Sequence, residues 1–353
     1  MNFDELVGYR PALERRLRAE YRSERRAAGP RFRTYVDALE EFTLRGGKRF
    51  RALLLLAGYW IASGRDPTVA LPAAAALEQF QSWMLIHDDI IDHAATRRGG
   101  PAVHRTFESA AGPDALPAAR AAFGEAIGIT LGDLEEPLTV GALLATPGPP
   151  ERRLAALAEY VRMTRATAYG QLLDIANGVR PIEEVTESDV LTVHRLKSAI
   201  YTVAAPLRLG AIFGGGRPPL LADLESIGVD AGIAFQLRDD VLGSGFDAGA
   251  AGKSANDIAE GKRTLLVIRA WARASPAERA VLVRAVGRAD ATDDEVEAAR
   301  GVMRATGALD YSEQRIRRLT GGVLRRIDRS RAIRAAARPL LREITDRLVV
   351  RAS

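Results

Sequence analysis

The chain has 353 residues, of which 47% are hydrophobic and 27% are charged, and its formal net charge is +5. This composition excludes disordered and fibrous proteins and provides enough apolar residues for a large core. The absence of cysteine excludes disulfides, thiolate metal sites and cysteine nucleophiles, and the basic residues are too evenly spread to indicate nucleic acid binding.

Helix signals follow one another along the chain, and no segment alternates with a period of two for long enough to predict a sheet. Asp66 and Pro67 are expected to begin a helix that continues to about Asp92, because aspartate caps helices and proline suits their first turn. Glycine and proline clusters predict breaks at residues 98–101, 147–150 and 214–219. Between these breaks, long helices are expected over residues 151–178 and 186–213.

The second half of the chain contains capping boxes at residues 275–278 and 292–295, and a weaker one at residues 186–189. The arginine-rich stretch 315–351 has apolar residues at helical spacing, which predicts an amphipathic helix pair that closes the domain. A role at a membrane surface is the alternative for this stretch. Length alone would fit two domains, but no linker or repeat divides the chain, so we predict one all-helical domain over residues 1–353.

A cytoplasmic protein without a transmembrane segment is expected. The chain begins Met-Asn-Phe-Asp-Glu, which is not a signal peptide. Its longest uncharged apolar stretch, residues 52–64, is shorter than the roughly 20 residues that a bilayer requires.

Lysine is rare in this chain, because arginine supplies all but four of the 50 basic residues. The four lysines are Lys48, Lys197, Lys253 and Lys262. Arginine serves as well as lysine on a solvated surface, but its planar guanidinium cannot replace a compact ammonium where a point charge must fit. The four positions are therefore predicted to be functional, with chance survival on the surface as the alternative.

The most specific local feature is the sequence LIHDDIID at residues 85–92. On a helix, Asp88 and Asp92 lie one turn apart on the same face. Placing two carboxylates among apolar neighbours costs free energy unless cations neutralise them. Mg²⁺ accepts carboxylate oxygens together with water and substrate phosphates, so this pair predicts a magnesium site. A solvated acidic face is the alternative.

A second acidic pair, Asp239 and Asp240, lies between apolar residues in the sequence FQLRDDVLG at residues 235–243. Two basic loops accompany the acidic pairs, RGGKRFR at residues 45–51 and RRGG at residues 97–100. Glycine amides and cationic side chains in such loops are able to surround a phosphate. Each basic loop alone is a weak signal, since many helices end this way, but together the segments indicate metal-binding helix faces and phosphate-binding loops.

These segments resemble the trans-prenyl diphosphate synthases, also called polyprenyl synthetases, in order and spacing from about Phe42 to Val267. Residues 88–92 resemble their first aspartate-rich motif, and residues 235–264 resemble the second motif with its two trailing lysines. The further matching segments are the Gly-Gly-Lys-Arg-x-Arg segment at 46–51, the basic turn at 97–99, Gln-x-x-Asp at 171–174, and Lys-Ser, for the family's Lys-Thr, at 197–198.

The resemblance implies the isoprenoid synthase fold, with a central cavity between antiparallel helices, in a homodimer. The implied reaction is a Mg²⁺-dependent head-to-tail condensation of isopentenyl diphosphate with allylic diphosphates. The residues implied to bind three Mg²⁺ ions are Asp88, Asp92 and Asp239. Those implied to bind the allylic diphosphate are Arg97, Lys197, Ser198, Gln236, Lys253 and Lys262. Those implied to bind isopentenyl diphosphate are Lys48, Arg51, Gln81 and Arg98.

The sequence departs from the family pattern at several positions. Gly243 stands where many relatives have a third aspartate, and Gly245-Phe246 inverts the usual order. Since the first aspartate is the implied ligand, metal binding is expected to survive. Ser198 keeps the hydroxyl of the usual threonine, and Gln81 replaces a histidine but is still able to donate to a phosphate. The four scattered histidines do not fit a metal site, and a supporting or core role is expected for them.

The resemblance implies that product length depends on residues about one turn before the first motif. Met84 lies four residues before Asp88 on the same face, where a growing chain would meet it. By helix geometry alone Trp83 is a core residue, but the family pattern gives a bulky aromatic at this position a role in limiting the elongation cavity. One aromatic there favours geranylgeranyl diphosphate over farnesyl diphosphate. Two further hypotheses for the function are a terpene cyclase and an inactive regulatory subunit.

Overall fold

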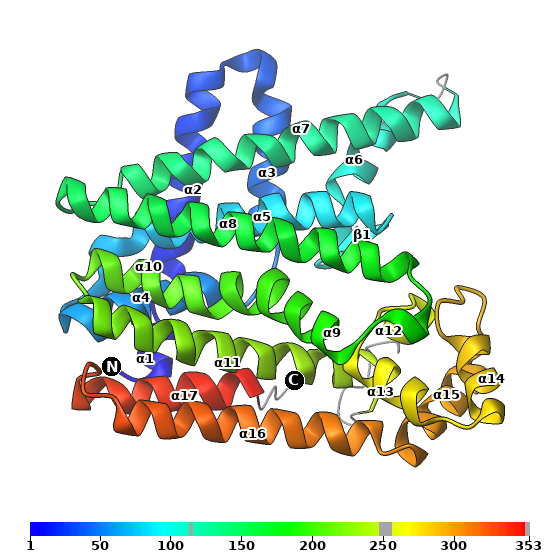
Figure 1. The fold of residues 1–353 in the computed structure, drawn as a ribbon. Helices are drawn as coiled ribbons and strands as arrows, with labels where there is room; N and C mark the ends of the chain where they lie inside the picture. The colour runs from blue at the N-terminus through cyan, green and yellow to red at the C-terminus, as the bar shows by residue number, and fades with distance from the viewer. Residues whose placement is uncertain (113–115, 247–255, 350–353) are drawn as a thin grey trace. The chain divides into compact units, whose positions relative to one another are not determined.

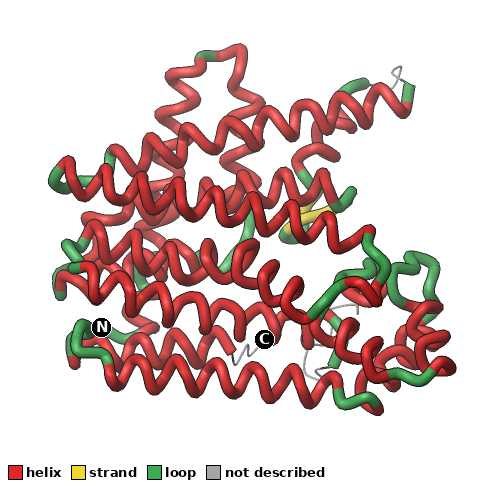
Figure 2. Tube along the Cα trace, viewed as in Figure 1, coloured by secondary structure: helices red, strands yellow, loops and turns green. Residues whose placement is uncertain are grey.

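The structure is a computed structural model that describes residues 1–112, 116–246 and 256–349. These residues fold almost entirely into helices (Figures 1 and 2). The strands found among them are two-residue segments, β1 (Thr96–Arg97) and β2 (Gly100–Pro101), which pair antiparallel across the basic turn. The all-helical fold class predicted from the sequence is confirmed.

The chain divides into two compact units, Met1–Ala158 with Pro206–Arg217, and Glu159–Ala205 with Pro218–Ser353. The helices of the first unit are α1 (Phe3–Val7), α2 (Arg10–Ala28), α3 (Arg33–Leu44), α4 (Phe50–Ser63), α5 (Leu71–Ile91), α6 (Val103–Ala110), α7 (Pro117–Leu144) and nearly all of α10 (Ala205–Phe213). Helix α8 (Pro150–Val179) begins in the first unit and continues into the second. The single domain over residues 1–353 stays a prediction.

The second unit contains the rest of α8 and the segments that follow it. Its other helices are α9 (Glu187–Val193), a π-helix (His194–Ala204), α11 (Pro218–Gly243), α12 (Asn256–Ala259), α13 (Leu265–Arg273), α14 (Pro276–Ala285), α15 (Asp293–Ala305), α16 (Ala308–Arg329) and α17 (Arg338–Val349). Short 3₁₀ turns span Pro30–Phe32, Pro67–Ala70, Ile182–Glu184 and Ala335–Ala337.

Local sequence signals determine many of the helix ends. Thr186, Ser275 and Thr292 each accept a hydrogen bond from the backbone N–H three residues on, in three complete capping boxes. Asp66 accepts a hydrogen bond from the Thr68 backbone N–H, so it caps the 3₁₀ turn that leads into α5. The predicted capping boxes, and the start of the predicted helix at Asp66, are confirmed.

The first unit is built around helices that are apolar on nearly every side. In α4, Ala52 to Gly58 are all buried, and α5 is buried continuously from Leu71 to Ser82. A helix with no polar face belongs in a core, where burial of its side chains stabilises the fold. Helix α5 therefore emerges from the core towards its C-terminal end, and that end carries the first acidic motif.

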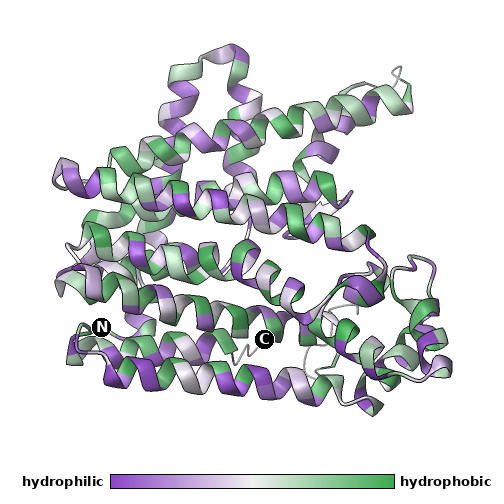
Figure 3. Cartoon of the chain, in the orientation of Figure 1, coloured by the Kyte–Doolittle hydropathy of each residue, from purple (hydrophilic) through white to green (hydrophobic). Residues whose placement is uncertain are grey.

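The core of the second unit gathers residues from α11, α13, α15 and α16, including Leu237, Val241, Leu266 and Ile316. The predicted C-terminal helix pair is present as α16 and α17, up to Val349, and Figure 3 shows hydrophilic and hydrophobic residues alternating along α16. Within the described ranges, no helix combines the length and the hydropathy needed to cross a membrane.

Candidate active site

The first acidic motif lies at the C-terminal end of α5. Asp88 is in the last turn and is partly exposed, and Asp92 is the exposed residue that ends the helix, with its N–H donating to the Asp88 carbonyl at 2.8 Å. Asp89, between them, is completely buried. The Arg97 Nε donates to Asp89 Oδ1 at 2.6 Å. Burial raises the pKa of Asp89 above its ordinary value, and the hydrogen bond and charge of Arg97 oppose this effect only in part. Two carboxylates thus remain near the surface, and the third holds the basic turn in place.

Backbone strain is concentrated beside the motifs. Among the described residues, the non-glycine positions with a positive φ are Arg49 at 54°, His93 at 51° and Arg98 at 54°. The preceding Gly46 and Gly47 also have positive φ angles, of 60° and 92°. Such conformations persist where the surrounding structure enforces them, and they cluster at functional sites. All three strained residues belong to the two basic loops or directly follow the first acidic motif.

The two basic loops of the first unit meet in space. A Cβ atom at Gly46 would lie 3.7 Å from Cβ of Arg98, and one at Gly47 would lie 3.6 Å from its guanidinium carbon. Arg49 is buried, donates to the carbonyl of Thr43 at 2.7 Å and pairs with Glu78 at 3.1 Å. Arg49 therefore stabilises the loop from within, while its neighbour Lys48 is exposed.

This cluster of cationic side chains has an excess of positive charge. Burial lowers the pKa of Arg98, and the neighbouring Arg49 and Arg51 lower it further, against the opposing effect of Glu78. Gln81 lies one turn after Glu78 on α5 and is buried, and its Oε1 atom has no hydrogen-bond partner among the described residues. An anion bound beside these arginines would relieve their mutual repulsion. Lys48, Arg51, Gln81 and Arg98 are the residues predicted for isopentenyl diphosphate.

In the second unit, Lys197 lies in the π-helix that follows α9. Its Nζ donates to Asp174 Oδ2 at 2.6 Å, which joins the predicted Gln-x-x-Asp and Lys-Ser segments. A Cβ atom at Gly170 would clash with the Lys197 backbone nitrogen, so only glycine permits this approach of α8. Sequence reasoning did not predict the π-helix, although such turns are frequent at functional sites.

The second acidic motif ends α11. Asp240 is buried, accepts a hydrogen bond from Gln236 Nε2 at 3.1 Å, and lies 3.1 Å from Nε2 of the buried His194. Asp239 beside it is only partly buried. Asp240 is thus fixed by two side chains, and Gln236, predicted to bind the allylic diphosphate, is bonded to Asp240 in this structure.

Lys262 follows α12 and pairs with Asp257 at 2.5 Å and with Glu260 at 3.0 Å. Burial lowers its pKa, but the two carboxylates outweigh this effect and hold the pKa above the ordinary value for lysine. A Cβ atom at Gly243 would clash with Asp257 Oδ2. The Asp257 carboxylate therefore fills the space that an aspartate at position 243 would need. Lys253 lies outside the described residues.

The structure thus joins the predicted residues into separate groups within each unit. Across the described ranges, no set of three or more acidic or histidine side chains is close enough to hold one metal ion. Asp88 and Asp92 belong to the first unit, and Asp239 belongs to the second. Their shared role in metal binding therefore stays a prediction.

Comparisons with known proteins identify the family. The family model described as polyprenyl synthetase matches residues 33–303. The chain belongs to the polyprenyl synthetase family. It is 35% identical over 280 residues to a short chain isoprenyl diphosphate synthase from Methanothermobacter thermautotrophicus, covering 79% of each chain. It is 32% identical over 318 residues to a geranylfarnesyl diphosphate synthase from Aeropyrum pernix, covering 87% of this chain and 91% of the relative.

The structure is also similar to that of a geranylgeranyl pyrophosphate synthase from Corynebacterium glutamicum, solved in complex with isoprenyl diphosphate and magnesium. The TM-score is 0.88 at 34% identity, and both chains are covered completely. The chain is therefore a prenyltransferase of the short-chain prenyl diphosphate synthase type, which confirms the resemblance found in its sequence.

The residues predicted to set product length lie on α5 of this polyprenyl synthetase. Trp83 is partly buried and packs edge-on against Phe80 and His87, with ring centroids 5.7 and 6.3 Å away. Its Nε1 atom is buried and has no hydrogen-bond partner among the described residues. Met84 is also partly buried. The edge-on contacts with Phe80 and His87 thus orient the Trp83 indole, which stays only partly buried.

Sequence reasoning missed a buried polar network that includes Ser82, the residue before Trp83. The Tyr21 hydroxyl donates to Glu135 Oε1 at 2.6 Å and lies 2.8 Å from Thr43 Oγ1, which lies 2.7 Å from Ser82 Oγ. All four side chains are completely buried, and burial raises the pKa of Glu135 to about 8. The four residues come from α2, α3, α5 and α7, so no local sequence pattern signals the network.

Proposed function

We propose that this polyprenyl synthetase condenses isopentenyl diphosphate with allylic diphosphates, head to tail, and that its main product is geranylgeranyl diphosphate. The observation that carries the proposal is the cluster of Arg49, Arg51 and Arg98, in which burial and the two neighbouring guanidinium groups lower the pKa of Arg98. A terpene cyclase has no need of a second diphosphate site, so this cluster favours a condensing enzyme.

The residues of the acidic motifs suit Mg²⁺. Asp88 and Asp92 present carboxylate oxygens at the exposed end of α5, and Asp239 is partly exposed at the end of α11. Hard oxygen donors that remain open to water and to substrate phosphates are the ligands that Mg²⁺ prefers. We propose that these three aspartates hold three Mg²⁺ ions, which would stabilise negative charge on the departing diphosphate.

The cationic side chains would bind and orient the two substrates. In this proposal Arg97, Lys197, Ser198, Gln236, Lys253 and Lys262 hold the allylic diphosphate, and Lys48, Arg51, Gln81 and Arg98 hold isopentenyl diphosphate. The carbon–oxygen bond of the allylic substrate breaks, and its electron pair leaves with the diphosphate. The isopentenyl double bond attacks the resulting allylic cation, and a proton then passes to an oxygen of the released diphosphate. Lys197 and Lys262 are already held by carboxylates, which preorganises their charges.

The proposed twenty-carbon product rests on Trp83 as the wall of the elongation cavity. Its edge-on packing against Phe80 and His87 fixes the indole, and the partly buried Met84 leaves a softer surface beside it. The Corynebacterium relative is named for a twenty-carbon product and the Aeropyrum relative for a longer one, so product length needs a direct measurement.

A homodimer and a cytoplasmic location complete the proposal. Large apolar side chains are exposed along a single helix, α8, at Leu154, Val161, Leu172, Ile175 and Val179. Such a stripe is costly in water and is typical of a surface that a second copy covers. Sedimentation equilibrium at micromolar concentration is expected to give twice the chain mass of 38.1 kDa.

One incubation tests the function. Purified protein is mixed with isopentenyl diphosphate, one allylic diphosphate at a time and Mg²⁺, and the dephosphorylated products are separated by chromatography. A twenty-carbon alcohol is expected. A fifteen-carbon product would indicate farnesyl diphosphate synthesis, a cyclic hydrocarbon would indicate a terpene cyclase, and no product with any substrate would indicate a regulatory subunit.

A further inference from the structure

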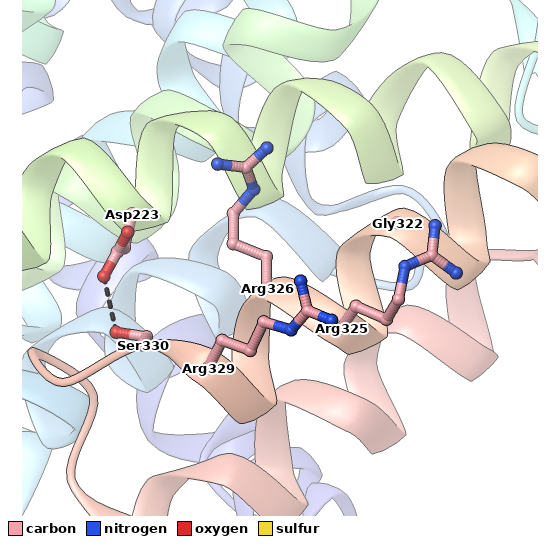
Figure 4. Close-up of a pocket in the computed structure, with 6 residues that line it drawn as sticks. All are labelled: Asp223, Gly322, Arg325, Arg326, Arg329 and Ser330. Atoms are coloured by element: carbon pink, nitrogen blue, oxygen red, sulfur yellow. Dashed lines mark hydrogen bonds between the residues drawn. The ribbon is translucent and has the colours of Figure 1, made fainter.

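A pocket of about 430 Å³ lies on the second unit, and none of the residues proposed for catalysis lines it. It is lined by Asp223, Gly322, Arg325, Arg326, Arg329 and Ser330. Figure 4 shows the three arginine side chains extending from α16 and Asp223 extending from α11. Asp223 precedes Asp239 by sixteen residues on α11, which corresponds to about 24 Å of helix at 1.5 Å per residue. The pocket is therefore separate from the second acidic motif.

The arrangement of charge in this pocket is unbalanced. Arg325 and Arg329 are four residues apart on the same face of α16, and both are exposed. Like charges at this spacing destabilise a helix. Among the described residues no carboxylate forms an ion pair with either side chain, and Asp328, the acidic residue between them, pairs instead with Arg342.

The two remaining charged groups of the pocket do not cancel the excess. Asp223 accepts a hydrogen bond from the Ser330 hydroxyl, and that hydroxyl oxygen in turn accepts from the N–H groups of Ala332 and Ile333 at 3.1 Å. This carboxylate is thus used to hold the turn after α16. Arg326 faces Asp230. Burial raises the pKa of Asp230 above its ordinary value, and the charge of Arg326 opposes this effect only in part. Asp230 does not line the pocket, and the charged groups that do, three guanidinium groups and the Asp223 carboxylate, carry a formal charge of +2.

Favourable interaction with the helix dipole explains only part of this cluster. Arg326 and Arg329 lie in the last turn of α16, where basic residues are stabilising. Arg325 lies before that turn, and Gly322, one turn earlier, adds no side chain to the pocket. A Cβ atom at Gly322 would meet no atom within 4 Å, so open space borders the guanidinium groups on this side. The helix dipole therefore does not explain why Arg325, which lies before the last turn, borders this open space without a carboxylate partner among the described residues.

We infer that this pocket binds a phosphate-bearing dianion. Guanidinium groups match phosphate oxygens in a bidentate geometry, and a charge of +2 complements a dianion. The Asp223 carboxylate repels an anion, but it is bonded to Ser330 and is outnumbered by the three arginines. The same chemistry is presented by inorganic diphosphate in solution and by the phosphomonoester headgroup of a lipid. This site does not depend on the function proposed above.

The test measures anion binding with pocket and control variants. All proteins carry Lys197→Gln, Lys262→Gln and Arg98→Gln, which weaken diphosphate binding at both proposed substrate sites, and the buffer contains EDTA. The pocket variant is Arg325→Gln with Arg329→Gln, since glutamine keeps helix propensity while removing the charge. The matched control, Arg317→Gln with Arg318→Gln, removes the same charge from two exposed positions of the same helix. Circular dichroism and thermal melting verify that each protein is folded.

Inorganic diphosphate is titrated calorimetrically, and vesicles of phosphatidylcholine with or without phosphatidic acid are tested by sedimentation. We expect the pocket variant to bind one of these phosphate sources at least about tenfold more weakly than the control variant does. Loss of diphosphate binding would identify a free anion as the ligand, and loss of binding to acidic vesicles would identify a lipid headgroup. Equal binding of both probes by the pocket and control variants would overturn the inference.

Discussion

The buried carboxyl group of Glu135 predicts an unusual dependence of stability on pH. Its side chain is completely inaccessible, its Oε1 atom accepts from Tyr21 at 2.6 Å, and its Oε2 atom has no partner among the described residues. Burial raises the pKa from the ordinary 4.5 to about 8, so the native state keeps this proton at neutral pH. The unfolded chain loses the proton above pH 4.5.

The sign and size of the effect follow from this difference. Between about pH 4.5 and pH 8 the native state binds more protons than the unfolded chain, so the free energy of unfolding falls as the pH rises. Each unit of pKa shift corresponds to about 1.4 kcal/mol, which gives a loss of up to about 5 kcal/mol over this range. Glu135→Gln keeps the shape of the side chain and removes the ionisation.

The assay is urea unfolding followed by circular dichroism at pH 5, 6, 7 and 8. We expect Glu135→Gln and the wild type to differ little at pH 5, and the variant to be more stable by a few kcal/mol at pH 8. Glu151→Gln, at an exposed position of α8, is the control and is expected to leave the pH profile unchanged. If Glu135→Gln and the wild type give parallel profiles from pH 5 to pH 8, Glu135 is ionised in the native state and the reasoning is wrong.

Three predictions concern catalysis. Asp88→Ala and Asp239→Ala are each expected to abolish condensation, because a metal ligand is lost. The melting temperature in EDTA is expected to stay unchanged or to rise, because charge crowding falls. Near-normal activity in either variant would refute the metal assignment. Lys197→Arg and Lys262→Arg are each expected to lower turnover at least about tenfold, or roughly 1.4 kcal/mol in the barrier, because a planar guanidinium cannot replace the ammonium groups held at 2.6 and 2.5 Å from carboxylates. Wild-type rates in both variants would show that charge alone is sufficient. Trp83→Ala is expected to lengthen the product beyond twenty carbons and to cost up to about 3–5 kcal/mol of stability, as measured by product chromatography and thermal melting. An unchanged product in a folded, active variant would place the end of the cavity elsewhere.

Features that depend only on neighbouring residues could be predicted without the fold. Helix ends at Thr186, Ser275 and Thr292 follow from hydrogen bonds within four residues, so the capping boxes predicted them correctly. The family could also be predicted from the sequence, because the spacing of the aspartates and lysines along the chain can be compared with the family pattern without knowing the fold. Charge and residue type in a short segment are sufficient for both conclusions.

Which of two similar neighbouring residues takes which role depends on contacts formed in the folded chain. Arg49 is buried against Glu78 while Lys48 beside it is exposed, and Asp89 is buried against Arg97 while Asp88 stays near the surface. These choices depend on the free-energy cost of burying a charge, which only a partner from another segment offsets. Adjacent residues of the same charge give no local signal of that partner.

The π-helix, the Glu135 network and the arginine pocket have the same origin. The close approach of Gly170 to the Lys197 backbone accompanies the π-helix, and the hydrogen-bond network of Glu135 joins residues from four helices. At the pocket, Asp328 pairs with Arg342 of α17, and no carboxylate in the described part of the chain pairs with Arg325 or Arg329. Contacts between segments distant in the sequence determine all three, and the physical cause in each case is packing or charge pairing that no short window of sequence contains.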